Sequence, residues 1–586
     1  MISSTQHQSW LFYMPLAKQA ALLNDDLLEP VDQLLDDPQL IELICECLAS
    51  RCPASTRTGR KGIAPDRLLR CCVLKHMKGW SFRDLERELR CNLIYRRFTH
   101  FDAEATPDFT TFSRTFALLG HSVTEKIHRR VVGVAREEGV AKGRKLRTDT
   151  TAVETNVHFP TDSTLLGDGI RVLSRSLKRI AAQCKSGAVE VVNHGRAVKH
   201  RLLEISRAAK SQSEAHRQRM RESYDKLLTL TRKVVRQAGE VVERWGKGKL
   251  PVIGSLLKVE VQASQLRHFL PFVEKVMVQT RERLWGGNTR VPDKVLSLFE
   301  PHTQVIRKGK AHKPNEFGRL VRIDEVENGI VSGYEVLQGN AADANSWLPA
   351  IEHHKACFGE APRMATADRR FFSAENERQA EGLGVEKVAL PARGRLSKKR
   401  AKRQKERWFK RALRWRAGSE RTISHLKNPF SMKRATYKGD PGFKRYVGWS
   451  VITKNLFSIA RWLERKRSGE YRMSKAAESS ARRRKLLREI ERLAEMAIFG
   501  TLSQSYRTCG RPGCHCQTGG PKHGPHLNIS YRGEKGKTTG YYVPKAAEEA
   551  TREGVAAWQK LQECLRELAE LNRDRNLERA REAESR

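Results

Sequence analysis

A long helical stretch divides the strand-forming segments of this sequence, and this order limits the folds open to the chain. Threonines and β-branched residues surround Asp149, and strand patterns return from Gln304 onward and again in residues 363–368 and 385–392. Between them, residues 165–290 carry apolar positions at helical spacing and contain no proline before Pro251. The sequence therefore predicts an α/β fold, in which a mixed sheet flanked by helices carries a long helical insertion at about 165–290.

Two local signals refine this prediction. Asn328 and Gly329 lie between two strand patterns, as the turn residues of a β-hairpin do. Residues 443–462 have the apolar spacing of an amphipathic helix, which we expect to pack on the sheet. The insertion itself is basic, so it is interpreted as a DNA clamp or a self-association element, with a plain helical spacer nearly as plausible.

Residues 1–140 predict an all-helical domain. Gly79 ends one helical pattern and Ser81 is a candidate N-cap for the next, with Asp84 three residues later. Short helices, tight turns and exposed arginines, Arg83 and Arg87 among them, favour a helix-turn-helix-like DNA-binding domain. The alternative is an ordinary helical bundle with a solvated basic face.

The charge of the chain indicates a polyanionic partner. The 586 residues include 110 Lys and Arg against 67 Asp and Glu, a net charge of +43 that is spread along the sequence. Nucleic acid is the leading candidate, although ribosomal and membrane-surface proteins are also basic. No segment reaches 18 consecutive apolar residues. The apolar patch at residues 10–16 follows no basic segment, so we expect no signal peptide.

Three acidic residues are candidate magnesium ligands. Asp149 lies in a predicted strand, Asp368 ends a short one, and Glu420 lies on a predicted helix between Arg416 and Lys427. Steps of four and seven residues return to nearly the same helix face, so one carboxylate would be flanked by two cations. Carboxylates that hold Mg2+ beside cations that hold phosphate suit phosphodiester chemistry. The spacing alone fits a surface salt-bridge ladder at least as well. From spacing alone, the rival acids would be turn or cap residues, namely Asp162, Asp168, Asp324 and Asp343.

Several of these segments resemble the DDE transposases of bacterial insertion sequences, over roughly residues 38–465. The resemblance is carried by LLRCCVLKHMKGWSFRDLERELRCNLIYRRFTHF, TDTTAVETNVHFPTDSTLLGDG around Asp149, EFGRLVRI, GYEVLQGNAAD, ATADRRF around Asp368 and ERTISHLK around Glu420. The family's signature at the glutamate is Tyr, two residues, Arg, three residues, Glu, six residues, Lys. Arg416, Glu420 and Lys427 match it, whereas Leu413 stands at the tyrosine position.

The resemblance implies an RNase H-like catalytic domain at 141–465 and a Mg2+- or Mn2+-dependent enzyme. Such an enzyme cleaves the ends of its own element and transfers the freed 3′-OH into target DNA. It implies Asp149, Asp368 and Glu420 as catalytic metal ligands and a homodimer on double-stranded DNA in a bacterial, nucleoid-associated setting. The candidate DNA-binding residues are Arg416, Lys427, Arg421, Arg83 and Arg87. A non-catalytic DNA-binding protein, either a repressor or an inactive relic, and an RNA-processing nuclease are the alternatives.

A compact Cys/His group sets the C-terminal part apart. Cys509, Cys514 and Cys516 lie on glycine–proline turns, and His523 or His526 would complete four soft ligands for Zn2+. Reduced surface thiols are the alternative. We expect a basic helical linker at 466–500, a zinc module at 501–545 and an amphipathic helix at 546–586 that is able to form a coiled coil.

Overall fold

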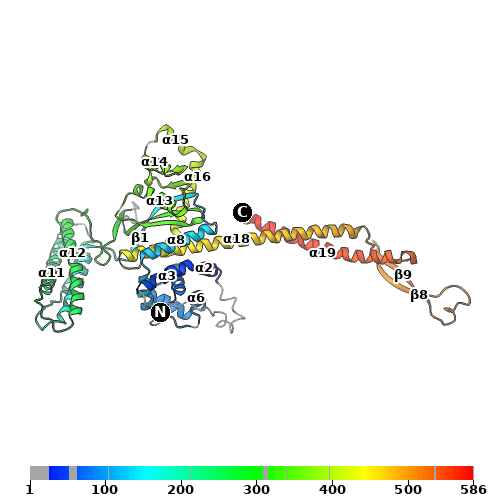
Figure 1. The fold of residues 1–586 in the computed structure, drawn as a ribbon, viewed down its shortest axis with the longest axis horizontal. Coiled ribbons are helices and arrows are strands. Elements are labelled where there is room, and N and C mark those ends of the chain that lie inside the picture. The colour runs from blue at the N-terminus through cyan, green and yellow to red at the C-terminus, as the bar shows by residue number, and fades with distance from the viewer. Residues whose placement is uncertain are drawn as a thin grey trace. The chain divides into compact units, whose positions relative to one another are not determined.

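The computed structural model describes residues 25–51, 62–307 and 315–584, apart from residues 103, 212, 340, 393, 395 and 534–535. The apolar patch at 10–16 lies outside these residues. The chain divides into two compact units, Met1–Trp462 and Leu463–Arg586 (Figure 1). Among the described residues, no helix is both long and apolar enough to span a bilayer.

The N-terminal part of the first unit is helical. Ser81 caps its helix in a capping box with Asp84, Gly79 ends the preceding helix with a left-handed φ of 67°, and Asp108 caps a third helix. These local signals explain why the segment breaks into short helices at these points. The helices are α2 (Leu28–Leu35), α3 (Pro38–Arg51), α4 (Pro65–Lys78), α5 (Phe82–Cys91), α6 (Leu93–Phe98), α7 (Phe109–Leu118) and α8 (His121–Glu137).

The first unit contains a seven-stranded mixed sheet. Its order is β2-β3-β1-β5-β6, while β4 also pairs with β3 and β7 with β1. β1 runs antiparallel to β3 and parallel to β5 and β7, and β5 runs parallel to β6. The predicted α/β class is confirmed. The strands are β1 (Lys145–Thr155), β2 (Gln304–Arg307), β3 (Asn315–Glu325), β4 (Val331–Val336), β5 (Met364–Ala367), β6 (Lys387–Ala389) and β7 (Arg434–Ala435).

The predicted hairpin turn is present between β3 and β4. Asn328 and Gly329 have φ values of 54° and 76°, in the left-handed region that these two residues tolerate best. The turn allows β4 to return antiparallel along the second half of β3. Sequence chemistry alone was sufficient to locate this turn.

Helices cover the sheet. The first part of α18 (Gly439–Ala494) packs Phe443, Val447 and Val451 against Val321 and Ile323 of β3 in one buried cluster. The N-terminal helices reach the same helix, since the ring of His76 on α4 lies 5.2 Å from that of Tyr446 and 6.2 Å from that of Trp449. The helices that follow β4 are α13 (Trp347–Phe358), α14 (Ala374–Gly382), α15 (Lys398–Lys405), α16 (Arg407–Ala417) and α17 (Ser419–Lys427).

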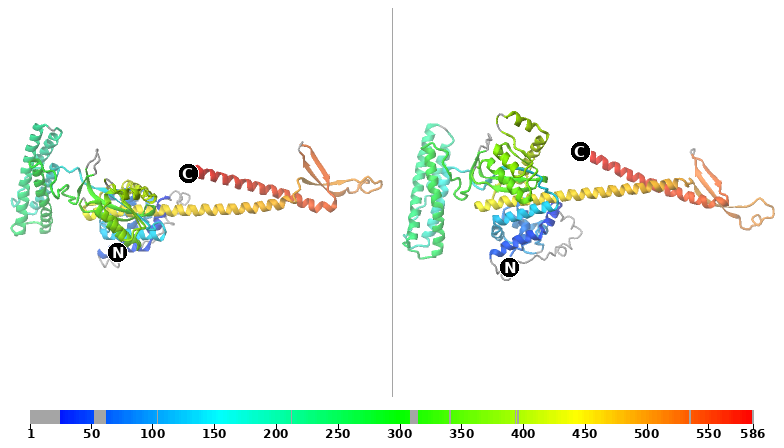
Figure 2. Two further views of the ribbon diagram at one scale, coloured as in Figure 1. Left: turned by 90° about the horizontal axis from the view of Figure 1, so that it is seen from above. Right: turned by 45° about the horizontal axis from the view of Figure 1, so that its top comes forward.

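The helical insertion lies between β1 and β2 in the sequence, and its helices form a separate bundle (Figure 2). This bundle has its own apolar core. Leu173, Leu227, Leu228, Leu266 and Val273 are among its buried side chains, which explains how the segment folds without contributing a strand to the sheet. Its helices are α9 (Asp162–Ala181), α10 (Gly195–Ala208), α11 (Glu214–Gly246) and α12 (Leu256–Leu284).

The second unit combines helices with a small antiparallel sheet. Near its end, α18 packs Leu486 and Leu493 against Ala557 and Leu561 of α19 (Glu548–Glu584). The apolar stripe predicted for the C-terminal helix is thereby used within the chain. The sheet has the order β10-β9-β8 and consists of β8 (Thr501–Arg507), β9 (His523–Arg532) and β10 (Thr538–Tyr542).

Candidate functional site

Two of the three candidate acids lie side by side at the centre of the mixed sheet. Thr148 of β1 pairs with Ala367 of β5 in a parallel ladder, and Asp149 and Asp368 each follow directly. Asp149 therefore belongs to the middle of a long strand, while Asp368 begins the turn after a short one. Residues 219 positions apart in sequence are brought together by one strand pairing.

A guanidinium group joins the two aspartates. The Arg416 Nη2 lies 3.3 Å from Asp149 Oδ2 and 3.9 Å from Asp368 Oδ1. The Ser419 hydroxyl donates to the same Asp149 oxygen at 3.0 Å, and the Thr150 main-chain N–H donates to Oδ1 at 2.8 Å. Both Asp149 oxygens are therefore held by donors from α16, from α17 and from its own strand.

Burial dominates the electrostatics of Asp149. Removal from water raises the pKa of its carboxyl group above the ordinary value, and the charge of Asp368 acts in the same direction. The Arg416 charge and the hydrogen bonds from Ser419 and Thr150 lower that pKa, but only in part. A carboxylate in this position favours a bound cation, because a cation offsets the cost of its burial.

Glu420 lines the same cleft as Asp149. The cleft has a volume of about 450 Å3 and lies between β1 and α17. Lys427 also lines it, as the helical spacing predicted, whereas Asp368 does not. The Glu420 side chain is exposed, so it stands at the open side of the cleft.

Asp149 lies near Asp368 and shares a cleft with Glu420, but the three carboxylates do not form a closed metal-binding group. In the described ranges, the Cys/His group is the one set of three or more candidate ligands whose ligand atoms all lie within 4.8 Å of one another. Arg416 lies against both aspartates, and Glu420 comes from a separate helix. The donor atoms are carboxylate oxygens, the type that Mg2+ prefers, so their chemistry fits this ion.

A buried ion pair behind the cleft fixes the two helices. Arg147 of β1 pairs with Glu325 of β3, and the same guanidinium donates to the Trp415 carbonyl oxygen at the end of α16. Glu325 also accepts a hydrogen bond of 2.8 Å from Thr422, two residues after Glu420. This network connects the sheet to the helices that supply Arg416, Ser419 and Glu420.

The remaining candidate DNA-binding residues are exposed. Arg421 lies on α17 next to Glu420, and its charge contributes to lowering the pKa of His425, after the larger effect of burial. Arg83 stacks over the Phe109 ring at 4.8 Å, and Arg87 pairs with Glu88 at 3.1 Å. These two side chains belong to α5, an element separate from the cleft.

Each of the rival acids has a structural partner, and the partner of Asp343 lines the cleft. Asp162 pairs with Arg283 at 2.5 Å inside the insertion and Asp168 with Arg171 at 2.6 Å, while Asp324 pairs with Arg322 at 3.0 Å. Asp343 accepts a hydrogen bond of 2.8 Å from Thr150. The interpretation as turn or cap residues was wrong for Asp168, which lies inside α9, and for Asp324, which lies in β3, whereas Asp162 does lie in the first turn of α9.

Sequence reasoning missed two acids of the cleft. Glu154 of β1 and Glu316 of β3 line it together with Lys433. Glu154 pairs with Arg434 at 2.8 Å. Their location follows from the antiparallel pairing of β1 with β3, which matches Glu154 with Gly318, and no local motif indicated it.

A larger cavity, of about 810 Å3, lies between α9 and α10 in the insertion. Its floor is apolar, with Ile170, Val198 and Leu202, and its rim is basic. The cations that line it are Arg171, Arg175, Lys178, Arg179 and Lys199. This rim gives the insertion a concentrated positive surface.

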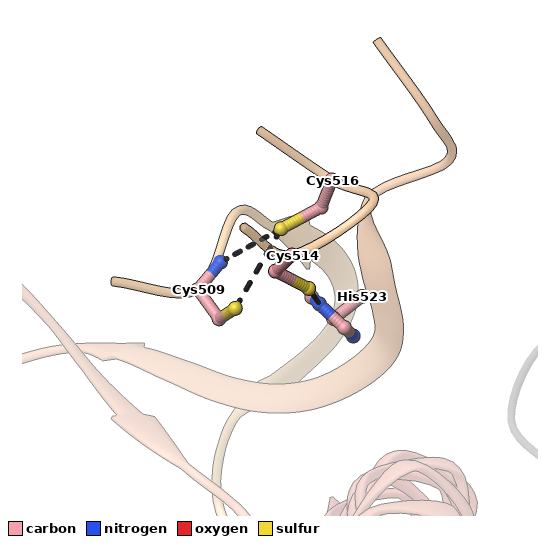
Figure 3. A group of neighbouring side chains, drawn as sticks. All are labelled: Cys509, Cys514, Cys516 and His523. Atoms are coloured by element: carbon pink, nitrogen blue, oxygen red, sulfur yellow. Dashed lines mark hydrogen bonds between the residues drawn. The ribbon is translucent and has the colours of Figure 1, made fainter. Parts of the chain in front are cut away.

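The Cys/His group lies at the open end of the small sheet (Figure 3). Cys509 follows β8, Cys514 and Cys516 lie in the connecting loop, and His523 begins β9. The Arg511 main chain is the largest influence lowering the pKa of the Cys509 thiol, which favours the thiolate that binds metals. The group can bind a metal such as zinc. His526 is not part of it, and its ring lies 5.8 Å from that of Tyr542.

Two segments match known families. Residues 17–118 match the family described as Transposase domain (DUF772), and residues 476–553 match a domain of unknown function, DUF6788. No curated protein and no solved structure matches the chain. The first match supports a transposase, and hence a nucleic-acid-processing enzyme with DNA as its partner.

Proposed function

We propose that this protein is a DDE-type transposase with an RNase H-like catalytic domain. It would bind the ends of an insertion sequence and catalyse their cleavage and strand transfer. The observation that carries the proposal is the parallel pairing of β1 with β5, which brings Asp149 beside Asp368 in a chain whose N-terminal segment matches a transposase domain.

Asp149, Asp368 and Glu420 would hold Mg2+, which would supply the charge that activates water and neutralises the leaving oxygen. Ser419 and the Thr150 main chain orient the carboxylate of Asp149, which lines the cleft. Arg416 and Lys427 would bind the phosphates of the terminal nucleotides, because both lie beside the acids and carry the opposite charge. The soft ligands of the Cys/His group suit Zn2+ instead, so we assign the two sites different metals.

Double-stranded DNA is the proposed partner at three places. Terminal phosphates would lie in the cleft, Arg83 and Arg87 would contact DNA from α5, and the basic rim between α9 and α10 would bind the phosphate backbone. Two chains are expected to act together, because transposition joins two ends. No contact among the described residues favours the repressor alternative.

Cleavage of DNA that carries the element's ends tests the proposal. The wild-type chain should cut it with Mg2+ and lose this activity when a chelator is added. Asp149→Asn should reduce cleavage on the order of 10² to 10³-fold, the cost of removing one preorganised charged group from an active site. Its binding to end DNA should persist in a gel-shift assay.

Asp225→Asn is the matched control, because this exposed aspartate lies on α11 of the insertion. It should cleave like the wild type. Full cleavage by Asp149→Asn would remove Asp149 from the site, and end binding without any cleavage by the wild type would favour the repressor.

A further inference from the structure

The module formed by β8, β9 and β10 has almost no hydrophobic core. Between residues 501 and 543, the side chains that are buried among the described residues are Cys516, Leu527 and Val543. β8 and β10 are largely exposed and most of β9 is only half-buried. Tyr506 of β8 is 57% exposed. Small domains with so little buried apolar surface usually depend on a disulfide or a metal for their fold.

The shortage of buried side chains is clearest in the connection between β8 and β9. Residues 508–522 contain no regular strand or helix, and of their side chains only that of Cys516 is buried. The turns are short, with the Gln517 N–H donating to the Cys514 carbonyl oxygen and the Gln517 amide donating to the Cys509 carbonyl oxygen at 2.6 Å. These hydrogen bonds lie within an exposed loop and bury little apolar surface, so they do not by themselves account for its compact arrangement.

The geometry of the four side chains fits one tetrahedral ion. The Cys509 and Cys516 sulfurs are 3.7 Å apart, close to the roughly 3.8 Å between two thiolates on a tetrahedral zinc with Zn–S bonds of about 2.3 Å. This distance is far too long for a disulfide, in which the sulfurs are about 2.05 Å apart. The Cys514 sulfur lies 3.1 Å from His523 Nε2, and Figure 3 shows the four side chains grouped together.

The surroundings of the sulfurs also resemble a built site. The Cys509 main-chain N–H donates to the Cys516 sulfur at 3.3 Å, an interaction that stabilises negative charge on a thiolate. Cys509 and His523 lie at the two ends of the connection. Cys509 comes two residues after Arg507 of β8, and His523 is the residue of β9 that pairs with Arg507. An ion held there would close the open end of the sheet.

We propose that Zn2+, held by Cys509, Cys514, Cys516 and His523, takes the place of a hydrophobic core in this module. The inference rests on the assignment of Zn2+ made above and deepens it. Four protein ligands complete a tetrahedral shell and leave no position for water or substrate, so the site is structural rather than catalytic. The binding free energy of the ion is thereby coupled to the folding of residues 501–543.

Metal analysis of the purified full-length chain is the first test. The wild type should hold about one zinc per chain by mass spectrometry. Cys514→Ser should lose this zinc, whereas Cys91→Ser should keep it, because Cys91 is an exposed cysteine on α5 outside the group. A wild-type chain without zinc would overturn both the assignment of Zn2+ and the proposed folding role.

Hydrogen exchange of the wild type is the second test and does not depend on a variant that folds. A zinc-selective chelator should remove protection from peptides of β8 and β9 and leave peptides of α9 to α12 unchanged, and added Zn2+ should restore it. Zinc bound stoichiometrically, with exchange unchanged on its removal, would overturn the folding role alone. Neither outcome depends on DNA cleavage.

Discussion

At the scale of single residues, the two central aspartates differ although they are neighbours. Asp149 is surrounded by donors from three elements, whereas Asp368 accepts a hydrogen bond of 2.8 Å from the next residue, Arg369, in the turn after β5. The first is positioned by tertiary structure and the second mainly by its own turn. Substitutions around Asp149 should therefore disturb the site more than substitutions around Asp368.

His100 provides a titration test of the N-terminal helices. It is buried, and its ring nitrogens lie 3.4 Å from Asp32 and 3.5 Å from Asp66. Burial lowers the pKa of His100, but the hydrogen bonds to the two carboxylates outweigh it, so the net shift is upward. The stability contributed by the charged ring is therefore complete below the unfolded-state pKa and is lost as the pH rises through the folded-state pKa.

We expect His100→Gln to destabilise α2 and α4 more at pH 5.5 than at pH 8.5, measured by hydrogen exchange of their peptides. His268→Gln is the control, because that histidine is exposed on α12. An equal effect of His100→Gln at both pH values would show that folding does not raise the pKa of the ring.

Local sequence chemistry predicted the structural roles of some residues and missed those of others. Ser81 with Asp84, and Asn328 with Gly329, act through neighbours in the sequence, so a short window was sufficient. Arg147 and Glu325 are 178 positions apart, and charged residues in strand patterns suggest a solvated face. Their burial becomes predictable only when the strand order is known.

At the scale of elements, the sheet holds α16 and α17 through buried charges. Lys454 of α18 adds to the group around Glu325, and burial lowers its pKa to about 8 while the Glu325 charge opposes that shift. Three elements thus share one carboxylate. Removal of that carboxylate leaves Arg147 and Lys454 as like charges in a buried space.

Glu325→Ala should therefore lower the free energy of unfolding by about 3–5 kcal/mol, the usual cost of breaking a buried pair. Thr422→Val should cost about 1–3 kcal/mol and reduce cleavage more than end binding, since it loosens α17 near Glu420. Glu335→Ala is the control, because Glu335 is half exposed and pairs with Arg322 at the edge of the same sheet. Denaturant unfolding and cleavage rates check these expectations, and similar costs for Glu325→Ala and Glu335→Ala would contradict them.

The rim between α9 and α10 is the second feature at this scale. Arg175→Glu with Lys178→Glu should weaken binding to DNA and reduce the slope of log K against log salt by about 0.9 per lost phosphate contact. Arg232→Glu with Lys233→Glu makes the same charge change on an exposed part of α11 in the same insertion. Equal losses in both double variants would show that only net charge matters.

At the scale of the whole molecule, the two family matches lie in the sequence before and after the residues that form the mixed sheet. Residues 17–118 and 476–553 are matched, while β1 to β7 and the candidate acids lie between them. The α/β class and the helical insertion could be predicted from periodicity. The order of the strands could not, because it depends on pairings such as β1 with β7, whose residues are 280 positions apart.

The complete chain should assemble on paired ends. Mixed with two copies of end DNA, it should form a complex that contains two chains, as measured by light scattering or sedimentation. Inverted repeats in the DNA on either side of the reading frame would be the natural substrate. A complex that remains at one chain per end at all concentrations would contradict the expectation.

Arg416 should couple the binding of a dication at the two central aspartates to the binding of nucleic acid. One guanidinium lies against two carboxylates and offsets only part of their negative charge, so a dication that enters between them has to compete with it. A nucleotide phosphate that binds the same guanidinium weakens its interaction with the two aspartates, and their negative charge is then less compensated. Nucleic acid and dication should thus reinforce each other's affinity, and by thermodynamic reciprocity the gain is the same whichever arrives first.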